Sequence, residues 1–431
     1  MATRKKKPAR KQTKAAKAKP APKSRRKKPV AKKAAGKIAP AAKSPAKIAA
    51  APSKADKPGE RAKPPFRVDH VGSFLRPDYL LDAARKAKDG AISADEYRRI
   101  QDKAVTEIVR FQESIGLRAV TDGEFRRRLW SAGFFDAVPG FGLREEGSLK
   151  SLTFRSDTKQ IEPIASPYAK QKLRRTKPIV VDDFKFLKKI VKKGVPKVTI
   201  PSPPVMHYFL GPKSVDEAVY PDIEEYFADL AKIYQQEISE LAKEGCTFVQ
   251  LDDTALPCNC DEHVRDDVRA RGEDPDKLTA RYAKLINESI KTRPKSMGIG
   301  IHLCRGNLKG MWMAEGGYEP VADKLFNEVG VDAYFLEYDS ERAGDFKPLR
   351  HVPKGKTIVL GLISTKTPKL ESKKELLRRI DDAAKYVPLD QLCVSPQCGF
   401  SSGGGGGQVV TQDDQKRKIG LLHEVAKTVW G

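Results

Sequence analysis

The stretch Ser296-Met-Gly-Ile-Gly-Ile-His-Leu-Cys304 alternates aliphatic residues with small or polar ones. Successive side chains of a β-strand point to opposite faces, so this pattern predicts a strand with Ile299 and Ile301 on the same face. His302 and Cys304 fall together on the other face, at the carboxyl end. The aliphatic face is expected to pack outward, which leaves an imidazole and a thiol directed at a common centre.

Similar apolar runs alternate with helical patterns from residue 64 onward. There are eight candidate strands: Arg67–Ser73, Leu117–Asp122, Lys197–Pro201, Thr247–Asp252, Gly298–Cys304, Ala333–Tyr338, Thr357–Leu362 and Gln391–Ser395. Strands that alternate with helices favour a (β/α)8 barrel over an open doubly wound sheet, because no Gly-rich phosphate-binding sequence follows the first strand. The expected fold is therefore α/β, a (β/α)8 TIM barrel.

Helix start signals support the same alternation. A helix is expected over Ser93–Ile115 because Ser93 and Glu96 form a capping-box pattern and apolar residues recur at helical spacing. Further helices are expected over Asp222–Glu244 and Asp413–Trp430. Another is expected to begin at Ser372, which forms a second capping-box pattern with Glu375. The region 142–196 is long, basic and weakly periodic, so it is interpreted as an excursion between the second and third strands.

Positive charge is concentrated at the N-terminus. The chain has a formal net charge of +26; residues 1–63 hold 23 Lys and Arg against 2 Asp and Glu, and the remaining residues hold 59 against 54. This Lys/Ala/Pro-rich composition predicts a disordered tail over 1–63, followed by a barrel over 64–431. Such a tail either stays solvated or contacts nucleic acid non-specifically through phosphates. No aromatic residue precedes Phe66, which argues against stacking on single strands.

Cysteine usage and hydropathy limit the protein's class. Six cysteines are few for 431 residues, and they are not spaced as a secreted disulfide framework, so a reduced, cytoplasmic protein is expected. No apolar run approaches the roughly 18 residues that a membrane span requires, and the N-terminus lacks an apolar signal core. No membrane partner is therefore expected.

Reactive side chains stand at the carboxyl ends of the predicted strands, which meet at one mouth of a barrel. Those with metal-ligand chemistry are His302, Cys304, Glu337 and Cys398. One imidazole and two thiolates with one open position describe a catalytic zinc site. We therefore predict a Zn²⁺ site in which Glu337 fills the fourth position at rest and leaves when substrate arrives. The alternative for Glu337 is a salt-bridged carboxylate near Arg342.

Carboxylates and a hydroxyl complete the predicted mouth. Glu124 and Asp252 could hold a substrate ammonium by charge-assisted hydrogen bonds, and Ser73, after Gly72, could bind a carboxylate. The alternatives are helix caps or Arg partners for the two acids and an ordinary turn for Ser73. Asp253 is equally compatible with a supporting role.

Three other features of the sequence remain open between function and structure. The basic run Arg126–Arg128 would attract an anionic substrate or simply be solvated, and Trp130, Phe134 and Phe135 would wall the pocket or belong to the core. The segment Cys258-Asn-Cys260-Asp-Glu-His263 contains metal-ligand residue types, but no second pair stands at finger-like spacing, so it is interpreted as mainly structural, with a role in lining the mouth as the alternative.

Six motifs in order resemble the catalytic, C-terminal barrel of cobalamin-independent methionine synthase. They are Val71-Gly-Ser-Phe-Leu-Arg-Pro77, Thr121-Asp-Gly-Glu-Phe125, Gln250-Leu-Asp-Asp253, His302-Leu-Cys304, Tyr338-Asp-Ser-Glu-Arg342 and Ser395-Pro-Gln-Cys-Gly-Phe400. The resemblance covers essentially all of 66–431 and points to short, single-barrel relatives. It implies zinc bound by His302, Cys304, Glu337 and Cys398, and homocysteine bound by Ser73, Glu124 and Asp252, of which Glu124 and Asp252 are the expected catalytic residues.

The resemblance implies zinc-dependent methyl transfer to the thiolate of homocysteine, which gives methionine. Two departures bear on the methyl donor. The N-terminal barrel that helps full-length enzymes bind polyglutamylated folate is replaced by the tail, and the stretch that carries the family's proton-transferring histidine reads Gly361-Leu-Ile-Ser-Thr-Lys366. Methyltetrahydrofolate, another donor such as a methylated corrinoid, and an epoxide as the electrophile for a small thiol all stay open, as does a nucleic-acid-associated protein with a passive barrel.

Overall fold

The structure is a computed structural model that describes residues 59–156, 158–161, 165–401 and 406–431. Residues 1–58, most of the tail that is expected to be disordered and to contact nucleic acid, lie outside the described residues. Arg61, at the end of the expected tail, donates hydrogen bonds to the carbonyl of Pro65 (2.8 Å) and the hydroxyl of Thr357 (2.8 Å). In the described part of the chain no helix is both long and apolar enough to cross a membrane.

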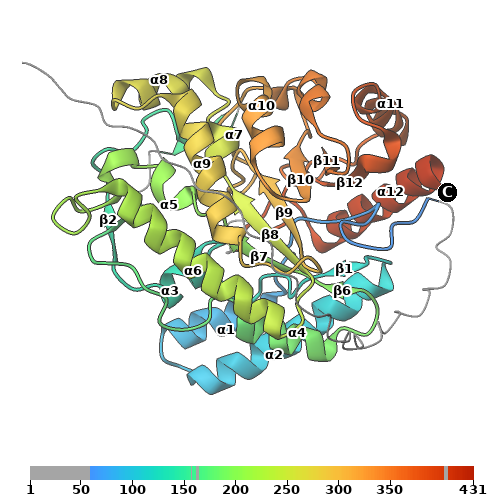
Figure 1. Cartoon of the computed structure of the whole chain (residues 1–431). Coiled ribbons are helices and arrows are strands. Elements are labelled where there is room, and N and C mark those ends of the chain that lie inside the picture. The colour runs from blue at the N-terminus through green and yellow to red at the C-terminus, as the bar shows by residue number, and fades with distance from the viewer. Residues whose placement is uncertain (1–58, 157, 162–164, 402–405) are drawn as a thin grey trace, which may run out of the picture. The chain divides into compact units, whose positions relative to one another are not determined.

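A parallel sheet forms the centre of the molecule (Figure 1). Its strands lie in the order β12-β11-β10-β9-β8-β7, and a second parallel pair joins β1 to β6. The bounds are β1 Ala119–Val120, β6 Val195–Pro196, β7 Val198–Pro201, β8 Phe248–Asp253, β9 Gly298–Leu303, β10 Ala333–Glu337, β11 Thr357–Ile363 and β12 Leu392–Pro396. The expected third strand is thus β7, with β6 directly before it.

The barrel closes through the segment 67–73. Val68 forms a parallel bridge with Val394 of β12, and on the other side the hydroxyl of Thr121, directly after β1, donates to the carbonyl of Gly72 (2.6 Å). The chain from β6 to β7 then links β1 to the six-stranded sheet, since the amide of Lys197 donates to the carbonyl of Val120 (2.8 Å). The fold is the expected (β/α)8 TIM barrel.

Two predicted strands are shorter than expected, because side chains bond backbone groups that would otherwise pair with a neighbouring strand. Over Arg67–Ser73 the structure forms only the isolated bridge at Val68, and the carboxylate of Asp69 accepts from the backbone amides of Phe66 (3.1 Å) and His70 (2.8 Å). Such local bonds compete with sheet pairing. Over Leu117–Asp122 only β1 forms, because the amide side chain of Gln112 bonds both the N–H (2.9 Å) and the carbonyl (2.8 Å) of Thr121.

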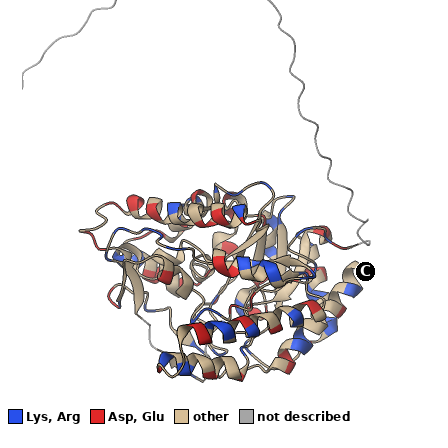
Figure 2. Ribbon diagram, turned by 90° about the horizontal axis from the view of Figure 1, so that it is seen from below, with Lys and Arg blue, Asp and Glu red and all other residues tan. Residues whose placement is uncertain are grey.

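Helices surround the sheet, as Figure 1 shows. The α-helices are α1 Asp78–Lys88, α2 Ala94–Ser114, α3 Ala132–Ala137, α4 Val181–Ile190, α5 Val205–Tyr208, α6 Ile223–Lys243, α7 Ala255–Cys258, α8 Glu262–Ala270, α9 Pro275–Ile290, α10 Glu319–Glu328, α11 Lys373–Ala384 and α12 Gln412–Trp430. The short 3₁₀ helices are η1 Gly211–Ser214, η2 Glu341–Ala343, η3 Lys347–His351 and η4 Leu389–Gln391. In Figure 2 acidic and basic residues alternate over these helices, in line with the nearly balanced charge of the barrel.

The helix caps confirm most of the predicted boundaries. The hydroxyl of Ser93 accepts from the amide of Glu96 (3.1 Å), and the carboxylate of Asp222 accepts from the amide of Glu224 (2.9 Å), which satisfies N–H groups that have no partner inside the helix. Of the two predicted capping boxes, the one at Ser93 forms only the bond from the Glu96 amide, and the one at Ser372 is wrong, because Ser372 is the N-cap of α11 but its side chain makes no cap hydrogen bond. A complete capping box joins Thr411 and Asp414 at α12 instead.

The excursion between β1 and β6 forms small structures beside the barrel. It contains the antiparallel pair of β2 (Phe141–Arg144) and β5 (Ser166–Ala169), the pair of β3 (Phe154–Arg155) and β4 (Gln160–Ile161), and helix α4. A bridge between Arg155 and Trp312 ties this region to the loop after β9. The excursion therefore reaches the carboxyl ends of the strands, where the predicted site lies.

Candidate metal centre and active site

Three strand ends bring one imidazole and two sulfurs together. His302 lies on β9, Cys304 directly follows it, and Cys398 follows β12. Their ligand atoms all lie within 4.8 Å of one another, and the three residues are buried. This trio is the only group of three or more His, Cys, Asp or Glu ligands with this geometry among the described residues. The alternating pattern of the opening stretch places His302 and Cys304 as predicted.

The geometry of the trio suits zinc. The two sulfurs are 3.6 Å apart, while two sulfurs bound at 2.3 Å to a tetrahedral zinc ion lie about 3.8 Å apart. Both ring nitrogens of His302 are buried without a nitrogen or oxygen partner, which is rare for buried polar atoms, and the sulfur of Cys398 interacts with the ring. A borderline-soft cation matches one nitrogen and two sulfurs. The residues present therefore fit a zinc ion.

The charge state of the cysteines favours metal binding. A hydrogen bond from Cys304 holds the pKa of the Cys398 thiol well below its usual range, with further stabilisation by His302 and Lys366, against the opposing effect of burial. The same hydrogen bond and burial raise the pKa of Cys304. Burial lowers the pKa of His302, but Cys398, Asp252 and Glu337 outweigh burial and raise it. The pKa values of the two thiols are therefore shifted in opposite directions.

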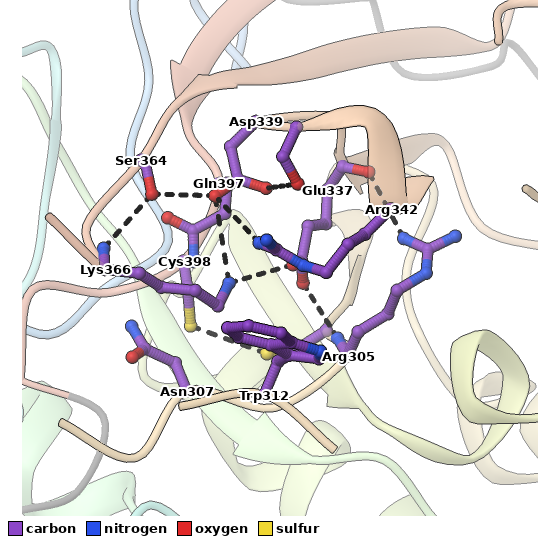
Figure 3. A network of polar contacts seen from close by, with 12 residues as sticks. Arg305, Asn307, Trp312, Glu337, Asp339, Arg342, Ser364, Lys366, Gln397 and Cys398 are labelled. Atoms are coloured by element: carbon purple, nitrogen blue, oxygen red, sulfur yellow. Dashed lines mark hydrogen bonds and ion pairs between the residues drawn. The ribbon is translucent and has the colours of Figure 1, made fainter. Parts of the chain in front are cut away.

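Glu337 lies next to the trio but is bonded elsewhere. It ends β10 and is buried. One carboxylate oxygen accepts from the ammonium of Lys366 (2.8 Å), and the other accepts from the backbone amide of Arg305 (2.8 Å) (Figure 3). The alternative of a salt-bridged carboxylate thus describes the structure, with Lys366 as the partner; Arg342 lies near Asp339 instead (3.8 Å). Zinc ligation by Glu337 remains a prediction.

The predicted substrate-binding residues face the same cavity as the trio. A cavity of about 700 Å³ is lined by Ser73, Glu124 and Asp252 together with His302, Cys304 and Cys398. The register of the sheet sets Asp252 on β8 directly beside His302 on β9. Since these residues come from the first, second, fourth, fifth and eighth segments of the barrel, only closure of the barrel brings them together.

Neighbouring side chains hold each of these groups in place. The carboxylate of Glu124 accepts from the hydroxyl of Thr199 (2.8 Å), and that of Asp252 accepts from the side-chain amide of Gln250 (2.7 Å). Glu124 has a φ of 61°, a left-handed conformation that costs energy in a residue other than glycine and that recurs at functional sites. Burial, followed by the charge of Glu124, raises the pKa of Asp252 to about 7.

Ser73 is positioned by a close approach of two strand ends. Its hydroxyl oxygen accepts from the amide of Ser401 (3.3 Å), which leaves the hydroxyl proton for another acceptor. A Cβ atom at Gly399 would lie 1.9 Å from this oxygen, so the backbone after Cys398 can pass here only as glycine. Asp253 is buried beside Asp252 and accepts from the amide of Leu256 (2.7 Å), consistent with a supporting role.

The structure decides the three features that the sequence left open: the basic run, the aromatic residues and the segment 258–263. Within the basic run, Arg126 is buried and paired with Asp183 (2.9 Å), Arg127 donates to the hydroxyl of Thr199 (2.8 Å), and only Arg128 is exposed. Trp130 and Phe135 line the cavity, whereas Phe134 is fully buried in the core. The segment 258–263 is structural: burial raises the pKa of both Cys258 and Cys260, and neither belongs to the metal-ligand trio.

Sequence reasoning missed two parts of the site. The first is Lys366. Its sequence position offered one clue, since it is a cation in the loop after a predicted strand. The second is the apolar outer wall of the cavity, which the excursion supplies through Phe141, Leu149, Leu152 and Phe154. These residues follow no strand-end pattern, so their place could not be found without the fold.

Comparisons with known proteins agree with this geometry. Residues 66–412 match the family described as "Cobalamin-independent synthase, Catalytic domain". The chain is 40% identical over 368 residues to the uncharacterized protein YxjH of Bacillus subtilis (85% of this chain, 95% of the relative), and 25% identical over 330 residues to the methionine synthase of Pyrococcus horikoshii (77% and 85%).

Solved structures show the same fold. A candidate vitamin-B12-independent methionine synthase from Listeria monocytogenes superposes with a TM-score of 0.67 at 34% identity, covering 85% of this chain and 98% of that one. A B12-independent methionine synthase from Shewanella, solved with selenomethionine, gives a TM-score of 0.63 at 20% identity, with 84% and 97% coverage. The chain therefore belongs to the cobalamin-independent methionine synthase family and forms its catalytic-domain barrel.

Proposed function

We propose that this protein is a zinc-dependent methyltransferase that methylates the thiol of homocysteine and so forms methionine. The observation that carries the proposal is the meeting of a nitrogen and two sulfurs, from His302, Cys304 and Cys398, with two carboxylates and a hydroxyl in one cavity. Family membership supports the reaction class, and the geometry of the trio supports the metal.

The trio would hold the zinc ion. Bound zinc supplies a Lewis acid that keeps a substrate thiol ionised near neutral pH, where a free thiol is mostly protonated. Glu337 is the fourth ligand expected from the resemblance. Since both of its oxygens are already hydrogen-bonded, a metal bond to this carboxylate would require one of those hydrogen bonds to break.

The amino-acid part of homocysteine would be held by the fixed polar groups of the cavity. Ser73 has a free hydroxyl proton to donate to the substrate carboxylate. Glu124 and Asp252, held by Thr199 and Gln250, would accept from the ammonium. A cation beside Asp252 stabilises its ionised form, so binding of the ammonium lowers the raised pKa of this carboxyl.

Positioning then supplies much of the rate. With the amino acid anchored at Ser73, Glu124 and Asp252, the substrate sulfur lies toward the trio and its lone pair attacks the donor's methyl carbon in line. The S–C bond forms as the bond from the methyl carbon to the donor breaks, and that electron pair leaves with the donor. Holding both reactants in such an arrangement replaces a bimolecular encounter by a nearly unimolecular step.

The cavity has room for a methyl donor beside the amino acid. Its volume of about 700 Å³ is lined in part by aromatic and aliphatic residues, among them Trp130 and Phe135 before the excursion and Phe154 within it. These side chains exclude water from the reacting atoms. We propose methyltetrahydrofolate or another methyl donor, such as a methylated corrinoid, as the second substrate.

A donor panel tests the proposal. Zinc-loaded protein is incubated with homocysteine and, in turn, methyltetrahydrofolate, its polyglutamylated form and methylcobalamin, and methionine is measured by mass spectrometry; the Cys398→Ser protein serves as the control. Methionine from at least one donor, and none with the control, supports the proposal. A folded, zinc-loaded protein that forms no methionine from any donor but opens an epoxide with a small thiol would support the thiol alkyltransferase alternative instead.

A further inference from the structure

The guanidinium of Arg76 is a polar group that the proposed reaction leaves without a role. It belongs to the first motif of the sequence, three residues after Ser73, and it does not line the cavity. One of its nitrogens donates to the hydroxyl of Ser401 (3.0 Å), and the other donates to the backbone carbonyls of Glu124 (2.6 Å) and Arg127 (2.9 Å). A single side chain behind the cavity wall thus joins two distant segments of the chain.

The bond to Ser401 leads to the hydroxyl that is proposed to bind the substrate carboxylate. The amide of Ser401 donates to the hydroxyl oxygen of Ser73 (3.3 Å), and the amide of Phe400 donates to the carbonyl of Ser73 (3.0 Å). Ser401 and Ser73 are both buried. Through the hydroxyl of Ser401, Arg76 therefore holds the segment against which Ser73 is placed.

The bond to the carbonyl of Glu124 holds a strained turn. Gly123 and Glu124 have φ angles of 69° and 61°, and a residue other than glycine keeps this left-handed conformation only where its surroundings fix it. The carboxylate of Asp122 accepts from the amide of Glu124 (2.9 Å). The carbonyl of Glu124 accepts from Arg76 and from the amide of Arg127 (3.2 Å). Both backbone groups of Glu124 are bonded, which fixes the direction in which its side chain leaves the turn.

A guanidinium is suited to setting the distance between these two segments. It is rigid and planar, and donors on its two terminal nitrogens keep their acceptors at a fixed separation. One terminal nitrogen of Arg76 serves the Ser73 side, and the other serves the Glu124 side. The ring of Phe125, whose centroid is 5.9 Å from the central carbon of the guanidinium, adds a cation–π contact that favours this placement.

The separation of the two groups matters for the substrate class. An α-amino acid carries its carboxylate and its ammonium on the same carbon atom, so the distance between the two charges is short and fixed. A site that binds both charges at once gains affinity only if its donor and its acceptor are held at the matching distance. Ser73 and Glu124 line the same cavity but come from different segments of the barrel.

We infer that Arg76 is a positioning residue that sets the separation between the hydroxyl of Ser73 and the carboxylate of Glu124. Through this separation it selects thiols that carry a complete α-amino acid group over thiols that carry only one of the two charges. The inference rests on the proposed function, because it takes Ser73 and Glu124 as groups that bind the amino-acid part of homocysteine.

Calorimetric titration of the zinc-loaded, full-length protein with three thiols tests the inference. The thiols are homocysteine, its deamino analogue, which keeps the carboxylate, and its decarboxy analogue, which keeps the ammonium. No methyl donor is added, so the affinities do not depend on turnover. The variants are Arg76→Met and Ser401→Ala, which removes the hydroxyl that joins the guanidinium to the Ser73 side. Arg99→Met, at an exposed arginine of α2, is the matched control.

The inference predicts a loss that is confined to the complete amino acid. Arg76→Met should weaken the binding of homocysteine at least about tenfold. Each analogue should bind this variant within about twofold of its affinity for wild type, because it uses only one of the two groups whose separation has changed. Ser401→Ala should show the same pattern with a loss of about threefold, and Arg99→Met should match wild type for all three thiols.

Three results for Arg76→Met would overturn the inference. An equal loss for all three thiols would show general damage to the barrel, a loss shared by homocysteine and one analogue would show support of one group only, and unchanged binding of homocysteine would show no role. If Arg76→Met does not fold, Ser401→Ala decides by the same pattern.

Failure of the proposed function would look different from failure of the inference. Wild-type protein that binds homocysteine no better than its two analogues would contradict the proposed amino-acid site, and the inference with it. Wild-type protein that prefers homocysteine, with the same preference in Arg76→Met and Ser401→Ala, would contradict only the inference.

Discussion

Two polar clusters are buried inside the same barrel, and they differ in how completely their atoms are bonded. At the first, the ammonium of Lys197 contacts Asp69 (3.0 Å) and the carbonyl of His70, and both charged side chains are fully buried. The carboxylate of Asp69 also accepts from two backbone amides. At the second, both ring nitrogens of His302 are buried without a nitrogen or oxygen partner, and the neighbouring groups are the sulfurs of Cys304 and Cys398.

This difference separates structure from function. In the first cluster the ammonium and the carboxylate bond each other and the backbone, as is typical of a structural ion pair. Buried nitrogens without partners cost free energy unless something else binds them. We therefore assign the Lys197–Asp69 pair to the stability of the barrel and the His302 cluster to metal binding.

The largest expected effect comes from breaking the bonded cluster. Lys197→Met leaves the carboxylate of Asp69 buried without its cation, and removal of one partner of a buried pair costs about 3–5 kcal/mol. Urea unfolding followed by circular dichroism measures this loss, and Lys369→Met, at an exposed site, is the control. A loss below about 1 kcal/mol would show that the pair does not support the barrel.

A pH effect of similar size is expected beside the same pair. Burial, reinforced by the charge of Lys197, lowers the pKa of His70 from 6.5 to about 4. The unfolded chain therefore binds a proton between pH 6.5 and 4 that the folded chain does not, so stability is full above pH 6.5 and falls by about 3 kcal/mol toward pH 4. The free energy of unfolding, measured in urea at several pH values for wild type and His70→Gln, should show this component only in wild type.

The metal cluster should respond to zinc, unlike the bonded cluster. Free zinc at 100 times its dissociation constant should stabilise the apo-protein by about 2.7 kcal/mol, because it binds only the folded site. Thermal unfolding with and without zinc should give this increment in wild type and in Lys197→Met, and none in Cys398→Ser. An equal increment in all three proteins would place zinc elsewhere.

A smaller effect is expected at the substrate end of the cavity. Asp252→Asn keeps the size of the side chain but removes the charge that binds the substrate ammonium, so kcat/KM for homocysteine should fall about tenfold or somewhat more. Zinc content should not change, because Asp252 is not a ligand. Steady-state kinetics with the best donor of the panel measure the effect, and unchanged kcat/KM would remove Asp252 from the substrate site.

The sequence predicted those parts of the molecule that depend on local patterns. Alternation in 296–304 placed His302 and Cys304 on one face, and the cap at Ser93 is formed as expected. The first two strands were overpredicted because Asp69 and Gln112 bond the backbone with their side chains. Whether a polar side chain turns back onto the backbone depends on tertiary neighbours, which a pattern of residue types does not contain.

The hydrogen-bond partners of the site's side chains could not be predicted from the sequence either. The pairing of Glu337 with Lys366 joins the end of β10 to a loop residue 29 positions later in the chain. The contact between Glu124 and Thr199 joins segments 75 residues apart and exists only because the barrel closes. Arg342 is closer to Glu337 in the sequence than Lys366 is, yet its guanidinium lies near the carboxylate of Asp339 (3.8 Å). Proximity in sequence was therefore a poor guide to the partner of Glu337.

Zinc content of the purified protein tests the central claim most directly. Wild-type protein, stripped with a chelator, reloaded with zinc and passed over a desalting column, should hold about one zinc ion per chain. Cys304→Ser and Cys398→Ser should lose it, whereas Cys260→Ser, a buried cysteine outside the trio, should retain it. Full zinc retention in both Cys304→Ser and Cys398→Ser would contradict the account.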